Sequence, residues 1–419
     1  MAANTQMRIV IKCLVERDNK MAELMAMHCS PPSKKQKRQN VVKDSIEKLG
    51  ERLPLVQKAV KSLSEGSFNA LFFLKMKTCN GCTGFGVRFS DAFCETESLQ
   101  EEFYPFYSLF TKGTTMLYNC LKDPSHVDSL DEISRILLAR LFTFLTDKDA
   151  LTFVKELERK SCGKLNEEAE ITVAMAEHVF SKLALRNRYT VDKTYKKHGV
   201  ISGLCQCGCD TDIKCRLGDT SLGEPSVWHG CPNIILSHGE EQVPVLVSGD
   251  TEISQGSKSS VEVKSKHLNY NEVKHQMIAQ AITFSFLQKK RFPSSKNSLV
   301  PAIGVSPKEV IFFFYDCKED VLMQSVKMPL RSGKGVRYST LIAIWLAVNY
   351  KYLGSGLTGN LQTAPKSHFF SLAKEVLHVY RNDLSMGGVS GSYEEDTVYP
   401  EEIPEEKICW PKEKPKFEF

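Results

Sequence analysis

The chain has 419 residues, of which 42% are hydrophobic and 25% charged, and its formal net charge is +5. This composition is ordinary for a soluble globular protein with two or three domains. No run of eighteen apolar residues occurs, so we expect no membrane span, and the apolar residues 9–15 are too short and interrupted a run for a secretory signal. Fourteen cysteines in such a chain indicate reduced thiols in the cytosol or nucleus, with metal binding as the exception.

The charge is distributed unevenly along the chain. Residues 393–419 hold nine acidic residues and four lysines, a net of −5, so the other 392 residues carry +10. A basic body suits a polyanionic partner, although many proteins with such a charge bind no nucleic acid. We expect residues 391–419 to form an acidic, disordered tail.

Residues 1–40 lack a long apolar periodicity and are expected to be flexible. They end in a cluster of four basic side chains that follows two prolines: Lys34, Lys35, Lys37 and Arg38. This pattern resembles a nuclear localisation signal, read by the import machinery, and predicts a nuclear protein of a eukaryote. The alternative is a solvated basic linker.

Residues 41–188 show mostly helical periodicity, and we expect a mostly helical N-terminal region. Apolar residues recur at spacings of three and four from Ile133 to Leu145, with Ser129 or Asp131 as the cap, and Asp147 is expected to cap the next helix. A further helix is expected at 166–188, with acids in its first turns. The apolar run 66–74 is ambiguous.

From about Tyr189 the pattern of apolar residues changes to short strand-like runs interrupted by helical ones. Strands are expected at 227–228, 234–236, 243–247, 260–264, 310–315 and 321–326, and helices at 271–290 and 340–352. This order predicts an α/β domain over 189–390, with a helical crossover after Lys264 and the aromatic run 312–315 as a buried central strand.

One group of residues in this domain has the side chains that a catalytic metal site needs. Pro232 and Asn233 open the apolar strand 234–236, and Glu262 and Lys264 share one face of the later strand, because side chains alternate along a strand. A carboxylate beside a lysine at the end of a strand suits a hydrolase that holds a hard metal ion and an attacking water.

These residues resemble the PD-(D/E)XK, or restriction-endonuclease-like, nuclease superfamily. Asn233 matches the first acidic position, Glu262 and Lys264 match the second element, and Gln276 and Gln280 lie on the following helix, where related nucleases place a glutamine near the site or the nucleic acid. The resemblance implies a mixed-sheet core, binding of DNA and hydrolysis of phosphodiesters with Mg²⁺. It covers residues 224–315, and the alternative is an unrelated α/β domain.

The substitution by asparagine bears directly on the activity. An amide keeps an oxygen ligand but removes a full charge, and loss of a group near a metal costs about 10–100-fold in affinity or activity. Glu224, Asp250 or Glu252 could supply a replacement acid. Two interpretations remain open: a Mg²⁺-dependent deoxyribonuclease, or a lapsed nuclease fold that binds nucleic acid or protein.

A second candidate site is rich in thiols. Cys205, Cys207, Cys209 and Cys215 lie within eleven residues and could hold a structural Zn²⁺ ion. The spacing lacks the usual two-residue knuckle with its N–H···S bonds, so a reduced cysteine-rich loop is an equal alternative. The Cys79–Cys82 pair has the two-residue spacing but no second such pair.

Overall fold

The computed structural model describes most of the chain in eleven stretches. They are residues 32–65, 69–161, 168–186, 189–193, 203–205, 207–209, 212–213, 217–238, 241–247, 270–333 and 335–389. The expected acidic tail, the strand 260–264 and most of the N-terminal 40 residues lie outside them.

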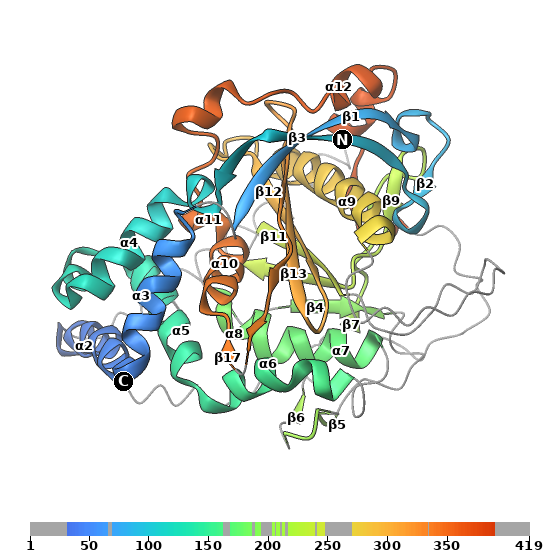
Figure 1. Cartoon of the computed structure of the whole chain (residues 1–419). Helices are drawn as coiled ribbons and strands as arrows, with labels where there is room; N and C mark the ends of the chain where they lie inside the picture. Colours follow the sequence, from blue (N-terminus) through green and yellow to red (C-terminus); the bar gives the residue numbers. More distant parts are fainter. Residues whose placement is uncertain are drawn as a thin grey trace, which may run out of the picture.

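A large mixed sheet forms the centre of the molecule (Figure 1). Its strands follow the order β3-β1-β14-β13-β12-β11-β10-β4-β7, and β15 pairs with β13. Their bounds are β1 Ala70–Cys79, β3 Cys94–Pro105, β4 Tyr189–Asp192, β7 Leu217–Gly218, β10 Ile234–His238, β11 Glu241–Val247, β12 Leu299–Val305, β13 Glu309–Asp316, β14 Val321–Ser325 and β15 Met328–Pro329. The fold is therefore mixed α/β, with mostly antiparallel pairing, and the strands expected at 234–236, 243–247, 310–315 and 321–326 are confirmed.

Three small sheets accompany the central one. In the first, β16 Arg331–Ser332 pairs with β17 Gly335–Val336, and in the second, β5 Gly203–Leu204 pairs with β6 Asp212–Ile213. The third has four strands in the order β18-β8-β9-β2. Their bounds are β18 Ser385–Met386, β8 Leu222–Gly223, β9 Trp228–Gly230 and β2 Val87–Arg88.

Helices pack around the sheet (Figure 1). They are α2 Pro32–Leu49, α3 Leu53–Ser62, α4 Thr111–Lys122, α5 Glu132–Thr146, α6 Lys148–Ser161, α7 Glu168–Met175, the π-helical turn η6 Ala176–Phe180, α8 Ser181–Leu183, α9 Tyr270–Arg291, α10 Tyr338–Val348, α11 Tyr350–Leu353, α12 Phe369–Leu372 and α13 Leu377–Asn382. No helix of the described stretches has the length and apolar character needed to cross a membrane.

The aromatic strand β13 is buried on both faces. Phe312 and Phe314 point to one side, where the Phe106 ring lies 5.2 Å and 5.9 Å from theirs. Tyr315 points to the other side, toward Phe286 of α9 at 6.0 Å. Successive side chains of a strand alternate between the two faces, so this run fills the core both above and below the sheet. The expected central strand is confirmed.

The N-terminal region is mostly helical but does not stand apart from the α/β domain. Strands β1 and β3 fall within it, and residues 71–73 of β1 pair with 323–325 of β14. The ambiguous apolar run before Cys79 is thus a buried strand rather than part of a helix. A boundary at residue 188 would cut through the central sheet, because β1 pairs with β14 in that sheet.

Several helix starts follow the expected caps. The Asp131 carboxylate accepts a hydrogen bond from the Ser134 backbone N–H at 2.7 Å, so Asp131 rather than Ser129 caps α5. Asp147 accepts from the N–H groups of Asp149 and Ala150 at 2.9 Å and 3.0 Å, at the start of α6. These carboxylates satisfy N–H groups that have no partner within the helix.

The strand order around β10 sets the surroundings of Asn233. Residues 234–236 pair with 189–191 of β4 on one side and with 243–245 of β11 on the other. Helix α9 then crosses over, and β12 joins β11 in parallel. The sequence predicts 260–264 as the neighbour of β10, but that segment lies outside the described residues and β11 occupies the place.

Candidate metal centre and the Asn233 site

Asn233 lies at the start of β10 in a buried polar environment. Its side chain is 7% exposed, and its amide Nδ2 donates a hydrogen bond to Glu168 Oε1 at 2.7 Å. Its backbone carbonyl accepts from the N–H of Asp192, the last residue of β4, at 3.0 Å. An acid from α7 and the end of a neighbouring strand therefore meet at the position that resembles the first nuclease motif.

Asp192 adds a buried carboxylate beside this position, whereas Glu168 is half-buried. The residue is 2% exposed, and the Thr220 hydroxyl lies 2.7 Å from Asp192 Oδ2 and 2.7 Å from the Pro232 carbonyl. That hydroxyl has one proton and donates to one of the two acceptors. Glu168 and Asp192 were not expected as site residues, because a first-turn acid is explained by the helix dipole and no pattern marks the end of β4.

The structure brings none of the other expected acids, nor Lys264, to Asn233 among the described residues. Glu262 and Lys264 lie outside the described residues, as do Asp250 and Glu252. Glu224 closes a local turn, accepting hydrogen bonds from the backbone N–H and the hydroxyl of Ser226. It joins no group of three metal-ligating side chains in the described part of the chain.

Both expected glutamines lie on α9. Gln276 is half-buried, whereas Gln280 is fully buried and its amide has no hydrogen-bond partner among the described residues. The neighbouring Met277 packs toward Gly304 of β12. The register of β10 and β11, continued by one residue, places Asn233 opposite Leu246, and Leu246 pairs with Gly304 of β12. The first half of α9 therefore lies over the same edge of the sheet as Asn233.

The thiol cluster is brought together with a histidine. His178 Nε2 lies 3.2 Å from Cys205 Sγ, 3.6 Å from Cys207 Sγ and 3.5 Å from Cys209 Sγ. The possible ligand atoms of all four residues lie within 4.8 Å of one another, so this group could hold a metal ion. His178, Cys205 and Cys207 are buried and Cys209 is exposed.

The electrostatics of the cluster favour a thiolate at its centre. Hydrogen bonds from the Cys205 thiol and from His178 lower the pKa of Cys207 to about 3 despite its burial. The pKa of Cys205 is raised in turn, because its thiol keeps the proton that it donates to Cys207 and because burial opposes its ionisation. The thiolate is the form of cysteine that ligates metals.

The fourth member of the cluster among the described residues is a histidine. The sequence predicts Cys215, which lies outside the described residues, and the structure supplies His178 from the π-helical turn η6. A single histidine within an apolar helical pattern gives no sequence signal for a ligand 27 positions before Cys205. The missing knuckle spacing is compensated in part, since the Cys207 N–H donates to Cys205 Sγ at 3.4 Å.

The Cys79–Cys82 pair lies elsewhere: Cys79 ends β1, and Cys82 ends the 3₁₀ turn that follows it. Cys94 of β3 stands opposite Cys79 across the strand pair. The pKa of Cys79 is raised far above its usual range by its thiol hydrogen bond with Cys82 and by burial. These thiols form no compact group of metal ligands in the described part of the chain.

The basic cluster 34–38 lies in α2, whose helix begins at Pro32. The backbone there is helical rather than irregular, and the side chains of Lys34, Lys35, Lys37 and Arg38 are not among those that the structure describes.

Comparison with protein-family models, with curated proteins and with solved structures gave no match to this chain. The function is therefore inferred from the chain's own residues.

Proposed function

We propose that this chain is a nucleic-acid-binding protein, with DNA as its partner, built on a restriction-endonuclease-like core. The observation that carries the proposal is the order of elements around Asn233: a hairpin of β10 and β11, the crossover helix α9, and β12 parallel to β11. The nuclease resemblance implies a strand that ends in an acidic residue, a loop, a strand with the second motif and then a helix. The strand, strand and helix order is the same here, whereas Asn233 stands at the start of β10. In this arrangement β11, rather than 260–264, is the second strand of the hairpin.

A basic surface at the same edge of the sheet supports a polyanionic partner. It consists of five side chains, which we call the basic edge: Lys155, Lys308, Lys327, Arg331 and Arg337. Glu158 lies 3.5 Å from Lys308 Nζ and 3.3 Å from an Arg331 guanidinium nitrogen, and Glu309 lies 3.1 Å from Lys327 Nζ.

The backbone links this surface to Asn233. The turn between β12 and β13 carries Lys308, and the Leu330 N–H donates to the Lys308 carbonyl at 2.7 Å. The sheet register places this turn at the edge where β10 begins. At about 4.8 Å per strand, β10 and β12 are roughly 10 Å apart across the sheet.

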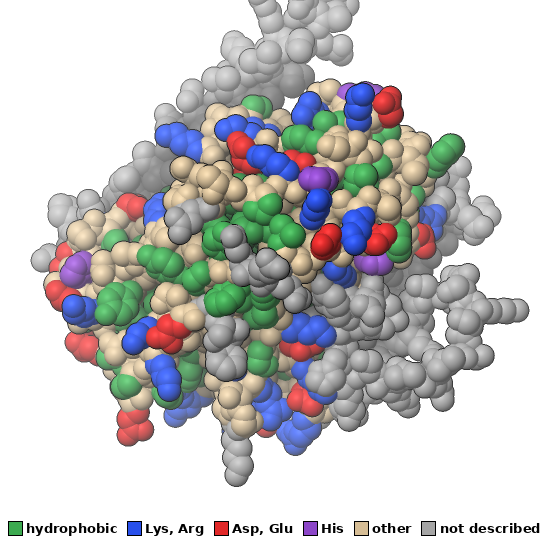
Figure 2. Space-filling model, turned by 45° about the horizontal axis from the view of Figure 1, so that its top comes forward, with side chains coloured by type: hydrophobic (Ala, Val, Ile, Leu, Met, Phe, Trp, Pro, Cys, Tyr) green, Lys and Arg blue, Asp and Glu red, His purple; other side chains and the backbone are tan. Residues whose placement is uncertain are grey.

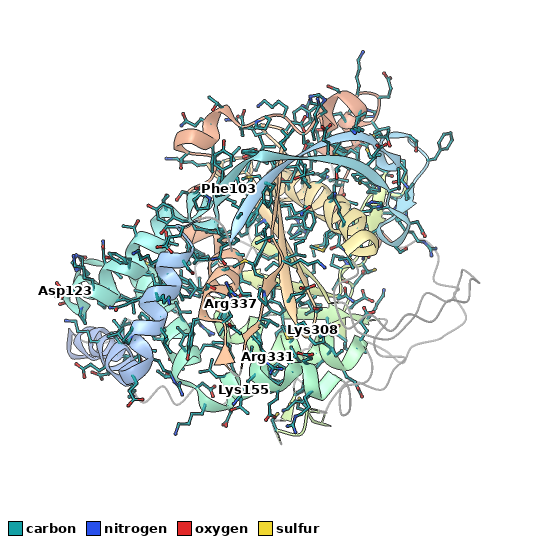
Figure 3. The ribbon with its side chains drawn as sticks, in the orientation of Figure 1. Phe103, Asp123, Lys155, Lys308, Arg331 and Arg337 are labelled. Carbon is teal, nitrogen blue, oxygen red and sulfur yellow. The ribbon has the colours of Figure 1, made fainter. Side chains whose placement is uncertain are left out.

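Figure 3 shows where four of these five side chains lie. Lys155, Lys308, Arg331 and Arg337 occupy the region around α6, α10 and the hairpin β16–β17 (Figure 3). The face turned forward in Figure 2 instead mixes acidic and basic side chains. A local excess of basic side chains attracts a polyanion.

Binding is favoured over catalysis by the state of Asn233. Its amide donates to Glu168, so it stands as a hydrogen-bond donor at the place where a metal ion needs an oxygen ligand. Mg²⁺ is held by carboxylates, waters and phosphate oxygens, and a neutral amide competes poorly for it. We therefore expect the wild-type chain to bind DNA and to cleave it slowly or not at all.

The test is a binding titration of fluorescein-labelled duplex DNA by anisotropy, over a series of KCl concentrations. We expect the combined variant Lys308→Gln, Arg331→Gln, Arg337→Gln to bind more weakly. The slope of log K against log salt should become shallower by about 0.9 for each phosphate that the variant no longer neutralises. The matched control is Lys58→Gln, Lys112→Gln, Lys122→Gln, which removes three exposed charges from α3 and α4.

Each result bears on a separate part of the proposal. Absence of binding by the wild-type chain at low salt overturns the nucleic-acid function. Binding that the triple variant and its control weaken equally shows that the basic edge is not the surface that meets the DNA. Circular dichroism of both variants checks that they remain folded.

A second candidate function is Mg²⁺-dependent hydrolysis, which the acid Glu168 beside Asn233 favours. With Glu262 as the second acid and Lys264 supporting the transition state, Glu168 would supply the charge that Asn233 lacks. Cleavage that requires Mg²⁺ or Mn²⁺ and is abolished by Glu168→Gln, Glu262→Ala and Lys264→Ala would establish this function. Cleavage that survives all three substitutions would indicate a contaminating nuclease.

For the His178 cluster we propose Zn²⁺ rather than Mg²⁺. Three sulfurs and an imidazole are soft donors that suit zinc, whereas Mg²⁺ requires oxygen. Zn–S bonds of about 2.3 Å and Zn–N bonds of about 2.0–2.1 Å at tetrahedral angles put the nitrogen roughly 3.6 Å from each sulfur. The distances of 3.2, 3.6 and 3.5 Å are close to this value. Metal analysis of the purified chain should find zinc, and Cys207→Ser should lose it.

Nuclear import through Lys34, Lys35, Lys37 and Arg38 completes the proposal, since a DNA-binding chain needs access to the nucleus. Changing all four to alanine should move a fluorescent fusion toward the cytoplasm. An unchanged nuclear signal would show that the cluster has another role.

A further inference from the structure

One continuous helical run joins the Asn233 site to the thiol cluster. It begins at Glu168 and passes through α7, the π turn η6 and α8 to Leu183. Glu168 contacts Asn233 at its first residue, and His178 meets the cysteines ten positions later. At about 1.5 Å per residue, roughly 15 Å of helix separates the two contacts.

The π turn lies where His178 must reach the cysteines. Met175 and Ser181, which flank the turn, both have right-handed helical dihedral angles, so the helix continues through it. π-helices are rare, appear mostly as single turns inside α-helices and are frequent at functional sites. His178 is 5% exposed, and the Phe153 ring packs against its imidazole with 4.6 Å between centroids.

A hydrogen bond alone does not explain this imidazole. Its Nε2 lies within 3.6 Å of three sulfurs, and one ring nitrogen can donate a single proton or accept one. A buried polar atom without adequate partners is costly. An ion at the centre of the four atoms would satisfy all of them together.

The loop that carries Cys205, Cys207 and Cys209 requires stabilisation beyond its own backbone pairing. It joins β5 to β6, a hairpin with two paired residues in each strand. Two-stranded hairpins are marginally stable at best in isolation. Gly208 permits the tight turn between the last two cysteines with a φ of +76°, and its N–H donates to the Cys205 carbonyl at 3.0 Å.

We propose that the metal ion acts as a structural clamp: by binding His178 and the Cys205–Cys209 loop together, it fixes the helix α7–η6–α8 and thereby holds Glu168 against Asn233. This inference rests on the Zn²⁺ of the proposed function. Among the described residues the donors are three thiols and one imidazole, and four protein ligands are the closed arrangement of structural zinc sites rather than the open one of catalytic sites. Metal loading would then control the Asn233 site from a distance.

The test is amide hydrogen exchange by mass spectrometry on the full chain, first loaded with Zn²⁺, then stripped with a chelator, then reloaded. We expect stripping to remove protection over residues 168–183 and over Ile234–Leu236, and reloading to restore it. Cys207→Ser should lower zinc affinity by at least about 10–100-fold and exchange like the stripped chain. Cys120→Ser, a buried thiol on α4, is the matched control and should retain zinc and protection.

A second readout ties the two sites together. Asn233→Ala should destabilise the loaded chain and have little further effect on the stripped chain, because stripping already releases Glu168. Zinc bound with exchange over 168–175 unaffected by its removal overturns the clamp and leaves the ion proposal standing. A purified chain that binds no zinc overturns both. If Cys207→Ser does not fold, the strip-and-reload cycle on the wild-type chain decides the question.

Discussion

At the scale of single residues, Asn233 is the position on which the function depends. An amide can donate to a carboxylate, and here it donates to Glu168 at 2.7 Å. An aspartate in its place would oppose that carboxylate with a second negative charge. Asn233 therefore has a structural role in this chain that the motif's usual acid could not fill without a cation between the two groups.

The hydrogen bond to Glu168 predicts the effect of Asn233→Asp. We expect a loss of about 1–3 kcal/mol of unfolding free energy at neutral pH without metal. The Glu168 carboxylate loses the hydrogen bond from Asn233 Nδ2, and the aspartate introduced at this buried position repels it. Urea unfolding measures it. Mg²⁺ or Mn²⁺ should recover part of the stability if the two carboxylates can share an ion.

The pH dependence of this variant has a definite sign. Repulsion from Glu168 raises the pKa of the introduced carboxyl in the folded state. The folded chain then binds more protons than the unfolded chain, so stability falls as pH rises through that range. The control Asn119→Asp lies in the last turn of α4, where an acid opposes the helix dipole, and should cost only about 0.3–1 kcal/mol. Equal stability of the wild type and the Asn233→Asp variant would mean that Glu168 moves away freely.

Some site residues could be predicted from the sequence and others could not, for physical reasons. Cys205, Cys207 and Cys209 are close in the chain, so their spacing alone predicts a thiol cluster. His178 and Glu168 reach their sites only through the packing of α7 and η6 against β10 and the cysteine loop. Residues that are far apart in the sequence and meet only in the folded chain have no characteristic spacing from which the contact could be predicted.

At the scale of elements, helix starts were the most predictable feature. Asp131 and Asp147 stand directly before apolar helical patterns, and both carboxylates accept hydrogen bonds from the first turn. The strand β1 was harder to predict, because its run Leu71–Leu74 is buried on both faces and alternates weakly. A continuous apolar run fits a buried strand and a buried helix equally well without its partners.

Asp147 gives a prediction for helix α6. Its carboxylate also accepts from Lys182 Nζ at 2.9 Å, which ties α6 to α8. Asp147→Ala should cost about 0.5–2 kcal/mol at pH 7, the usual loss for a helix cap. Chemical denaturation measures the loss, and Asp383→Ala, at an exposed site after α13, serves as control.

The pH dependence of that loss follows from the carboxyl's pKa. Burial alone would raise the pKa of Asp147, but hydrogen bonds from Ala150 and Lys182 outweigh burial and lower it below the ordinary 3.8. A depressed folded-state pKa contributes stability that is present above 3.8 and is lost as pH falls through the lowered value. The difference between the wild type and Asp147→Ala should shrink on acidification, and a constant difference would show that the charge contributes nothing.

At the scale of the whole molecule, the chain forms one core rather than two. Strand β1 from the N-terminal region pairs with β14, and the Trp345 indole N–H of α10 donates to the Leu137 carbonyl of α5 at 3.1 Å. Asn349 donates to the Leu183 carbonyl at 2.9 Å, which again joins distant parts of the sequence. The pattern of apolar residues along the chain changes near Tyr189, but such a change does not show which strands pair.

A single core predicts a single unfolding transition. Trp228 packs beside Phe369, with 5.8 Å between ring centroids, and Trp345 lies on α10; both are fully buried. In a Trp410→Phe background, Trp345→Phe leaves Trp228 as the only indole, and Trp228→Phe leaves Trp345. Within each variant we expect the fluorescence and far-UV circular dichroism transitions in urea to share one midpoint, because both indoles belong to one cooperative unit. If the Trp345 signal is lost at a different urea concentration from the dichroism, the N-terminal helices unfold separately. The pairing of β1 with β14 would then be too weak to couple the two halves of the chain.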